Sequence, residues 1–158
     1  MTAINYTSGD ATSPEGRPAI IVHVCNDVGA WGAGFVLAIS RLWPEPEARF
    51  RNWARGREAT PFALGEVQFV SVEPGLVVAN LIGQHGLRRR GAERPVRIDA
   101  IARGLRTVAR EALDTGASVH MPRIGCGLAG GTWREIGPVV EREIASRAVD
   151  VTVYDLAR

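Results

Sequence analysis

Residues 119–131 read VHMPRIGCGLAGG, and this stretch decides the class of fold. The apolar run 119–124 predicts a strand, and the glycine-rich loop 125–131 follows it directly. The next residues, Thr132-Trp133-Arg134-Glu135, have the spacing of a capping box and predict a helix, which Pro138 should delay or bend. A strand, a glycine loop and a helix in this order are typical of an α/β fold.

The same order of features occurs earlier in the chain. Residues 19–25 read AIIVHVC, a nearly continuous β-branched run that is typical of a strand buried on both faces. The glycine-rich turn 26–34 follows, and residues 35–43 predict a helix that ends at Pro44. Pro46 then predicts the start of a second helix, which extends to about residue 55.

The remaining segments predict further strands and one long amphipathic helix. Strands are predicted at residues 4–7, 66–73, 76–82 and 149–156, the helix at residues 96–114, and loops at residues 9–18 and 83–94. The middle two of these strands are predicted to form a hairpin. Because strands and helices alternate through the second half, we expect an α/β sandwich with a mixed, partly parallel central sheet.

The composition narrows the classes of function. The chain has 158 residues, which fits one domain over residues 1–158. All 19 residues counted as lysine plus arginine are arginines, and the absence of lysine excludes a lysine Schiff base and a P-loop lysine. The formal net charge of +2 is nearly balanced and argues against nucleic acid as the main partner.

The N-terminal sequence predicts a cytoplasmic protein, which we expect to be a monomer. No basic region followed by an apolar run opens the chain, and the apolar run 19–25 is too short to span a membrane. Cys25 and Cys126 are expected to be free thiols, and the three scattered histidines have no zinc-like spacing. We therefore expect no metal and no cofactor.

The two glycine loops are the main candidates for a functional site. Each follows an apolar strand, and in open α/β sheets ligands bind at the carboxyl ends of the strands. Glycine lets the backbone approach an anion, so two such loops could hold a diphosphate between them. Gly125, Gly127 and Gly130 match a dinucleotide-binding spacing, but only one strand follows them, which disfavours that fold. Plain tight turns remain the alternative.

Several motifs together resemble the macrodomain family over nearly the whole chain. They are Gly9-Asp10, His23-Val24-Cys25-Asn26, Trp31-Gly32-Ala33-Gly34, Met121-Pro122-Arg123-Ile124-Gly125-Cys126-Gly127-Leu128 and the closing Val151-Thr152-Val153-Tyr154-Asp155-Leu156. The segment 121–128 looks most like the terminal ADP-ribose protein glycohydrolase branch. The resemblance implies a three-layer α/β/α sandwich that binds ADP-ribose and, in many members, hydrolyses its linkage to proteins or to small acyl groups.

The resemblance also implies a set of ADP-ribose-binding residues. Asp10 would accept a hydrogen bond from the adenine amino group, with Ala11 beside it, and Asn26 would face the distal ribose. Leu156 would make an apolar contact. The two loops would cradle the phosphates and the distal ribose through Gly32, Ala33, Gly34 and Phe35, and through Arg123, Ile124, Gly125, Cys126, Gly127, Leu128 and Ala129.

The catalytic residues of that branch are absent from this sequence. Its lysine nucleophile and its aspartate acid/base correspond here to Gln84 and Ala129, and the acid of another branch falls near Val36. The candidate catalytic residues are therefore Gln84, Asn26 and His85. An amide can orient a water molecule, and an imidazole can act as an acid or a base.

Four functions remain open from the sequence. The leading one is hydrolysis of ADP-ribose from acidic side chains of proteins, by attack of water, with ADP-ribose and ADP-ribosylated proteins as partners. The others are a non-catalytic ADP-ribose reader, a hydrolase of a small derivative such as ADP-ribose 1″-phosphate, and a basic nucleic-acid binder. Two further residues have alternative interpretations. Asp27 either caps a turn or positions water, and Cys126 either is a small residue that fits the tight glycine loop or acts as a nucleophile. Residues 88–90 either form a solvated loop or steer an anionic partner.

Overall fold

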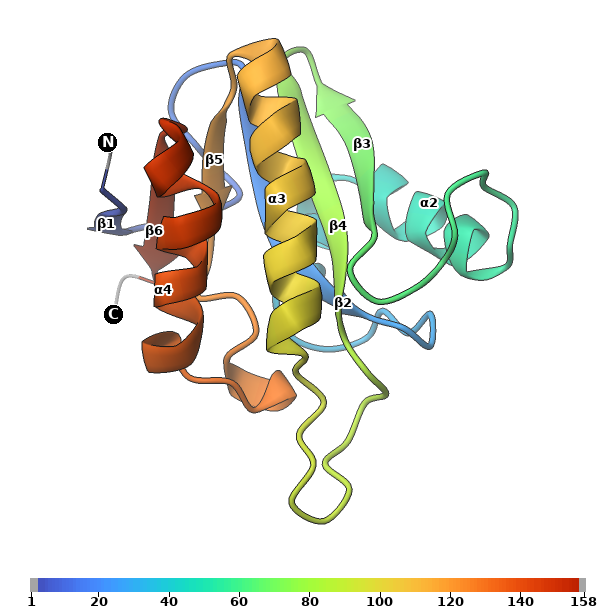
Figure 1. Ribbon diagram of the computed structural model, residues 1–158. Helices are drawn as coiled ribbons and strands as arrows, with labels where there is room; N and C mark the ends of the chain where they lie inside the picture. The colour runs from blue at the N-terminus through green and yellow to red at the C-terminus, as the bar shows by residue number, and fades with distance from the viewer. Residues whose placement is uncertain (1–2, 157–158) are drawn as a thin grey trace.

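A central mixed sheet organises the computed structural model, which describes residues 3–156. The six strands lie in the order β1-β6-β5-β2-β4-β3 (Figure 1). Their bounds are β1 Asn5–Ser8, β2 Ala19–Asn26, β3 Val67–Glu73, β4 Leu76–Gln84, β5 Ser118–Met121 and β6 Val151–Asp155. Only β3 runs antiparallel, because it forms the predicted hairpin with β4.

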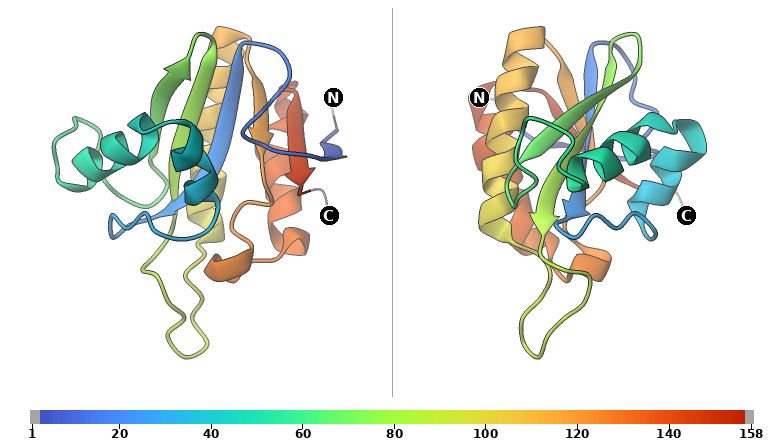
Figure 2. Two further views of the ribbon diagram at one scale, coloured as in Figure 1. Left: turned by 180° about the vertical axis from the view of Figure 1, so that it is seen from behind. Right: turned by 90° about the vertical axis from the view of Figure 1, so that its right-hand side faces the viewer.

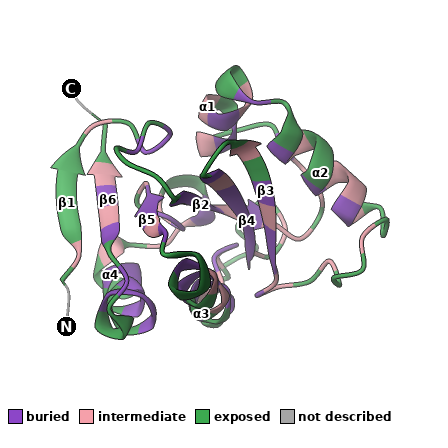
Figure 3. Cartoon of the chain, turned by 90° about the horizontal axis from the view of Figure 1, so that it is seen from above, coloured by how far each residue is buried: buried purple, intermediate pink, exposed green. Residues whose placement is uncertain are grey.

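Helices cover both faces of this sheet. The helices α1 (Phe35–Leu42) and α2 (Glu45–Ala54) lie on one face. The helices α3 (Ile98–Thr115) and α4 (Trp133–Glu143) lie on the other face (Figures 2 and 3). Two short 3-10 helices, η1 (Gly127–Ala129) and η2 (Ala145–Arg147), flank α4. The expected three-layer α/β/α sandwich is confirmed.

Two apolar layers hold the helices to the sheet. In β2, Ile20 and Val22 pack into the layer under α3 and α4, while Ile21 and Cys25 pack into the layer under α1 and α2. Side chains alternate between the faces of a strand, so the AIIVHVC run is buried on both sides as its sequence predicts. None of the helices that the structure describes is long and apolar enough to cross a membrane.

Glycine allows the close packing of α3 against the sheet. A Cβ atom at Gly104 would overlap the side chain of Leu81 in β4. The absence of that atom lets α3 lie directly against the middle of the sheet. The position of α3 matters for the site, because its first residue follows the loop that leaves the end of β4.

Several predicted boundaries differ from the structure. The strand β5 ends at Met121 rather than at residue 124, because Pro122 has no N–H group for the ladder. The helix α3 begins two residues later than predicted: Arg97 is its N-cap in an extended conformation, and the first helical bond runs from the N–H of Ile101 to the carbonyl of Arg97. The expected delay of α4 is wrong: this helix begins at Trp133 and continues through Pro138.

Candidate functional site

A cavity of about 520 Å³ lies where the carboxyl ends of β2, β4 and β5 meet. These strands are mutually parallel, so their following loops gather at the same edge of the sheet. The volume is in the range of small-molecule sites. The lining residues are His23, Val24, Cys25, Asn26, Ala30, Gly32, Ala33, Gly34, Phe35, Val36, Gln84, Leu87, Pro122, Arg123, Ile124, Gly125, Cys126, Gly127, Leu128 and Ala129.

The first loop of the cavity is braced by the side chain of Asn26. Its Oδ1 accepts hydrogen bonds from the backbone N–H groups of Val28 (3.1 Å) and Ala30 (3.0 Å). Its Nδ2 donates to the carbonyl oxygen of Ala30 at 2.8 Å. Three bonds from one amide fix the path of the chain after β2, so Asn26 shapes the wall of the cavity.

The same loop leads to an open helix N-terminus. Gly34 is the N-cap of α1, has φ +83° and provides no side-chain cap. The first N–H groups of α1 therefore lie next to the cavity without a competing side chain. A helix N-terminus of this kind favours an anion.

The second glycine loop is a closed turn that packs on the core. Gly131 donates its N–H to the carbonyl of Gly125 at 2.9 Å, and Gly130 donates to Gly127 at 3.0 Å. Gly125 has φ +74°, and a Cβ there would lie 2.7 Å from the side chain of Ile136. Both the backbone conformation and the lack of space require glycine at this position.

The side chain of Arg123 anchors this loop from outside. Its guanidinium donates two hydrogen bonds to the carboxylate of Asp155, at 2.6 Å and 3.0 Å. It also lies over the rings of Tyr6 and Trp133, with its carbon 5.6 Å and 5.4 Å from their centroids. The hydrogen bonds from Arg123 hold the pKa of Asp155 below its usual value. Arg123 thus ties the loop to the ends of β1 and β6.

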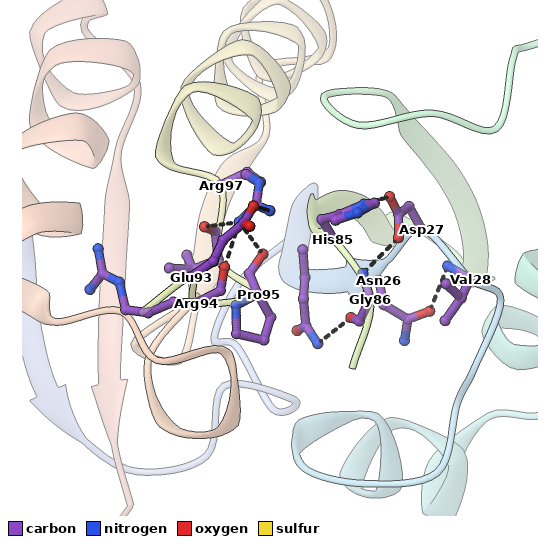
Figure 4. A network of polar contacts seen from close by, with 11 residues as sticks. Asn26, Asp27, Val28, His85, Gly86, Glu93, Arg94, Pro95 and Arg97 are labelled. Carbon is purple, nitrogen blue, oxygen red and sulfur yellow. Dashed lines mark hydrogen bonds and ion pairs between the residues drawn. The ribbon is translucent and has the colours of Figure 1, made fainter. Parts of the chain in front are cut away.

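At the opposite wall, the end of β4 is fastened to the first loop. Asp27 accepts a 2.6 Å hydrogen bond from Nδ1 of His85 and a 2.9 Å bond from the N–H of Gly86 (Figure 4). Gln84 donates its Nε2 to the carbonyl of Gly86 at 3.0 Å. Although burial raises the pKa of Asp27, the bonds from Gly86 and His85 lower it below the usual value overall. Asp27 therefore joins two loops, as a capping residue does.

The titratable side chains that line the cavity are poorly suited to nucleophilic or acid–base chemistry. Burial lowers the pKa of His23 to about 4 despite its 2.5 Å hydrogen bond with Asn80, so the ring is neutral near pH 7. Burial also raises the pKa of both thiols, Cys25 and Cys126. The nucleophile reading of Cys126 is therefore disfavoured, since a thiolate is the reactive form.

The cavity brings together most of the residues that the sequence singled out. Asn26, Gln84, residues 32–35 and residues 123–129 line it, whereas Asp10, Ala11, His85 and Leu156 do not. Asp10 is exposed and its Oδ1 accepts from both the N–H and the hydroxyl of Thr12, which is an Asx turn. Its segment adjoins the end of β6, because Gly9 donates to the carbonyl of Asp155.

Sequence reasoning missed several residues that line the cavity. They are His23, Val24, Cys25, Ala30, Val36, Leu87 and Pro122. The strand residues could have been found from their position, because the last residues of a parallel strand border any site at its carboxyl end. Leu87 carried no such signal, since it lies in a loop that the sequence marks only as polar and basic. Residues 3–156 contain no group of three or more His, Cys, Asp or Glu side chains that could hold a metal ion.

Solved structures similar to this chain agree on the fold. A protein of unknown function from Bacteroides thetaiotaomicron is 48% identical, with 98% of this chain and 99% of that chain covered and a TM-score of 0.93. A macrodomain protein from Streptomyces coelicolor is 52% identical, with coverages of 96% and 98% and a TM-score of 0.85. DarTG from Thermosipho africanus, solved with ADP-ribose, shares the fold at 19% identity over 87% of this chain and 38% of that chain (TM-score 0.68).

Curated proteins give matches of two kinds. The mouse chromodomain-helicase-DNA-binding protein 1-like is 28% identical over 99% of this chain, and its zebrafish counterpart is also 28% identical. The chain spans only 18% and 16% of the lengths of these two proteins. An ADP-ribose 1″-phosphate phosphatase from Chaetomium globosum is 33% identical, with 72% of this chain and 70% of that protein covered. No protein-family model matches the chain.

Proposed function

The chain belongs to the macrodomain family, an ADP-ribose-binding family, and on this premise we propose that it removes ADP-ribose from acidic side chains of modified proteins. The observation that carries the proposal is the pair of glycine loops on one cavity of about 520 Å³. We take residues 1–158 as a single macrodomain. The resemblance of residues 121–128 to the terminal ADP-ribose protein glycohydrolase branch belongs to the same proposal.

The cavity has the features that a diphosphate requires. Gly34 leaves the N-terminus of α1 uncapped at one wall, and the backbone of the loop segment 125–129 lines another. Fixed N–H donors stabilise phosphate charge without the cost of desolvating a lysine. The adenine would then extend toward Asp10 and Leu156, and the distal ribose toward Asn26 and Gln84.

The proposed hydrolysis uses a water molecule as the nucleophile. The oxygen of Gln84, Oε1, accepts no hydrogen bond from any residue that the structure describes, so it is free to hold that water. The water oxygen attacks the anomeric carbon of the distal ribose, and the bond to the carboxylate oxygen breaks. The attacking water loses its proton to the departing carboxylate or to solvent, which leaves ADP-ribose and a free acidic side chain. Positioning of this kind can supply several kcal/mol of barrier lowering.

Neither the lysine nor the aspartate of the glycohydrolase branch takes part in this proposal. Gln84 and Ala129 stand at those positions, and both thiols of the cavity have raised pKa values. His85 lies outside the cavity lining and is held by Asp27, so its contribution is the most indirect of the three candidates. The proposal therefore rests mainly on Gln84, with Asn26 as the residue that shapes the loop.

A second candidate function follows from one relative. The Chaetomium globosum protein is named an ADP-ribose 1″-phosphate phosphatase, so the same cavity could take a 1″-phosphate in place of a protein ester. In that reaction water would displace the ribose oxygen from phosphorus and release inorganic phosphate. The two functions differ in the bond broken and in the product released.

Three measurements on the purified chain separate these functions. Calorimetry with ADP-ribose, with AMP as the control, should give micromolar binding for ADP-ribose. Incubation with a glutamate-ADP-ribosylated protein should release ADP-ribose faster than the spontaneous rate. Binding without release would make the protein a reader, and release of phosphate from ADP-ribose 1″-phosphate alone would favour the phosphatase. Absence of ADP-ribose binding would refute the proposal as a whole.

A further inference from the structure

A narrow loop between β4 and α3 projects beyond the edge of the sheet that carries the cavity (Figures 1 and 2). We call residues 85–95 the arginine arm. Two isolated bridges hold its sides together, one between Gln84 and Val96 at its base and one between Arg90 and Glu93 near its tip. The arm is therefore an ordered hairpin-like element.

The base of the arm is fixed to the body of the protein. His85 donates its backbone N–H to the carbonyl of Pro95 at 2.8 Å, and its ring nitrogen Nδ1 contacts Asp27 at 2.6 Å. Gly86 donates to the other oxygen of the same carboxylate (Figure 4). These contacts hold the arm in one position beside the cavity before any ligand arrives, which reduces the entropy lost on binding.

Three consecutive arginines on the arm have no counter-charge. Arg88, Arg89 and Arg90 are exposed, and no acidic side chain among residues 3–156 forms an ion pair with them. Their three charges exceed the formal net charge of the whole chain, which is +2. The arm is thus a local concentration of positive charge on a nearly neutral protein.

The other arginines near the arm are already neutralised. Arg94 forms two hydrogen bonds with Glu135, at 2.8 and 2.9 Å, and Arg97 pairs with Glu93 at 2.6 Å. These pairs hold the wall of the arm in place. The unpaired charge of the arm itself is therefore confined to residues 88–90.

The arm borders a second cavity that adjoins the first. This cavity has a volume of about 610 Å³, and Leu87 lines both cavities. A molecule that fills the first cavity and continues outward past Leu87 reaches the arm. The residues of the second cavity are Val28, His85, Gly86, Leu87, Arg88, Arg89, Arg90, Glu93, Arg94 and Arg97.

We propose that the arginine arm binds an acidic polypeptide segment next to the modified residue, so that the protein prefers ADP-ribose attached within acidic sequences. This inference rests on the proposed function, because it names the substrate class of the same site. Three adjacent arginines match carboxylates on neighbouring residues of an extended peptide, since guanidinium groups pair with carboxylates in a bidentate geometry. No Phe, Tyr or Trp side chain lines the second cavity, and its one imidazole, that of His85, is held by Asp27 at 2.6 Å, which favours polypeptide over single-stranded nucleic acid.

The test compares a charge-removing variant with a matched control. In the arm variant, Arg88, Arg89 and Arg90 are each replaced by Gln. In the control, Arg41, Arg55 and Arg110 are replaced by Gln. These three residues are also exposed, have no ion pair in the described part of the chain and line neither cavity. Both variants lose the same total charge, so a difference between them reports position and not net charge.

Two peptides with one ADP-ribosylated glutamate serve as substrates, one with Asp and Glu on both sides of it and one with Ser and Ala. The arm variant should raise KM for the acidic peptide by about tenfold with kcat unchanged, because exposed ion pairs contribute modestly but add over three sites. Its KM for the neutral peptide and its Kd for free ADP-ribose should match those of the wild type. If the protein binds without hydrolysing, the Kd values of the two peptides replace KM.

Each other outcome overturns a separate claim. Equal effects of the arm variant on both peptides, or the same effect in the control, would refute the arm as a peptide site while the ADP-ribose site stands. Stronger competition by a single-stranded oligonucleotide than by an acidic peptide of equal charge would replace polypeptide with nucleic acid. If the arm acts through charge, as proposed, the preference of the wild type for the acidic peptide should decline as the salt concentration rises. Failure of the wild type to bind ADP-ribose would refute the proposed function and, with it, this inference.

Discussion

Asn26 and Gln84 end neighbouring strands and both line the cavity, but their hydrogen bonds give them different tasks. Asn26 uses both ends of its amide to hold the loop that follows β2. Within the described residues, the side chain of Gln84 makes one hydrogen bond, from its nitrogen to the carbonyl of Gly86. A side chain with a free acceptor can bind water, whereas a side chain that braces a loop affects binding through the shape of the wall.

Replacement of Gln84 should therefore separate catalysis from binding. We expect Gln84→Ala to lower the rate of ADP-ribose release by about 10- to 100-fold, because the attacking water loses its position, while the Kd for ADP-ribose changes little. Gln84→Glu retains the Oε1 acceptor and should keep more activity than the alanine variant. Single-turnover rates together with calorimetry provide the measurement. An unchanged rate in Gln84→Ala would show that another group holds the water.

Glycine substitutions distinguish a ligand contact from a structural requirement. Gly32 is exposed, and a Cβ there would meet no atom within 4 Å, so Gly32→Ala should leave the melting temperature unchanged. A methyl group in the path of a phosphate should weaken ADP-ribose binding by about tenfold. Gly125→Ala should instead destabilise the fold by about 3 kcal/mol, from its left-handed backbone and from overlap with Ile136. Thermal unfolding and calorimetry on the two variants check both expectations.

The sequence predicts the glycine loops of the site but not the contacts between distant residues. The loops were recognisable because glycine after an apolar strand has a local meaning. The hydrogen bond between His85 and Asp27 joins residues 58 positions apart, and the local sequence around neither residue predicts it. Contacts of this kind depend on how β2 and β4 pair, which only the assembled sheet defines.

At the scale of elements, the N-terminus of α4 is the clearest local prediction. The predicted capping box is present: Thr132 accepts from the N–H of Glu135, and Glu135 accepts from the N–H of Thr132. The sequence could not indicate that Arg94 also binds Glu135 and donates to the carbonyl of Gly130. The cap of one helix thus supports both the second glycine loop and the wall of the arginine arm.

Loss of this cap should weaken the helix. We expect Thr132→Ala to lower the free energy of unfolding by about 1 kcal/mol, because the N–H of Glu135 loses its side-chain acceptor. Thr107→Ala is the matched control, since Thr107 lies inside α3 and alanine is favoured there. Denaturant titrations of both variants give the comparison. An equal cost at the two positions would mean that the cap contributes nothing specific.

Boundaries of elements were less predictable than their existence. The strands and helices expected from periodicity are all present, whereas some of their ends differ by up to three residues. The start of α3 shows why: the N–H groups of Val96 and Arg97 bond to Ala129 and Gly83, and Arg97 is held in an extended conformation as the N-cap. Where an element begins therefore depends on contacts between its flanking residues and other parts of the chain, and local sequence does not contain those contacts.

At the scale of the whole molecule, local sequence patterns could not predict the order of the strands in the sheet. Alternation of strands and helices predicts a partly parallel sheet, but the chain order does not reveal that β1 pairs with β6 or that β2 lies between β4 and β5. Family resemblance supplied the three-layer architecture that periodicity alone left open. Because β2 lies between β5 and β4, its carboxyl end lies between the other two strand ends that border the cavity.

Two buried histidines should make the whole fold sensitive to acid. Burial lowers the pKa of His23 and of His120 from 6.5 to about 4, and Arg17 adds to the effect at His120. Between these two pH values the unfolded chain binds protons that the folded chain does not, so stability falls as the pH drops from about 6.5 to about 4. For His23 the loss approaches ~3 kcal/mol.

Denaturant titrations between pH 7 and pH 4.5 measure this dependence. Glu135 contributes little to the change in stability over this range. Its hydrogen bonds with Arg94 and Thr132 lower its pKa to about 2, so the stability that it adds is lost only as the pH falls below about 4.5. We expect a His120→Gln variant to show a shallower decline than the wild type. A flat profile in the wild type would contradict the assignment of neutral, buried imidazoles.

Chemical labelling of the two thiols can report whether a ligand occupies the cavity. Cys25 is only 3% exposed, whereas Cys126 is partly exposed on the second glycine loop, so a thiol reagent should add one label to the native protein and two after denaturation. Because the raised pKa of Cys126 keeps the thiol protonated, the reaction needs a moderately alkaline buffer. A molecule that occupies the cavity would slow this single addition. Intact-mass spectrometry could then rank candidate ligands without a tag, a dye or an engineered cysteine.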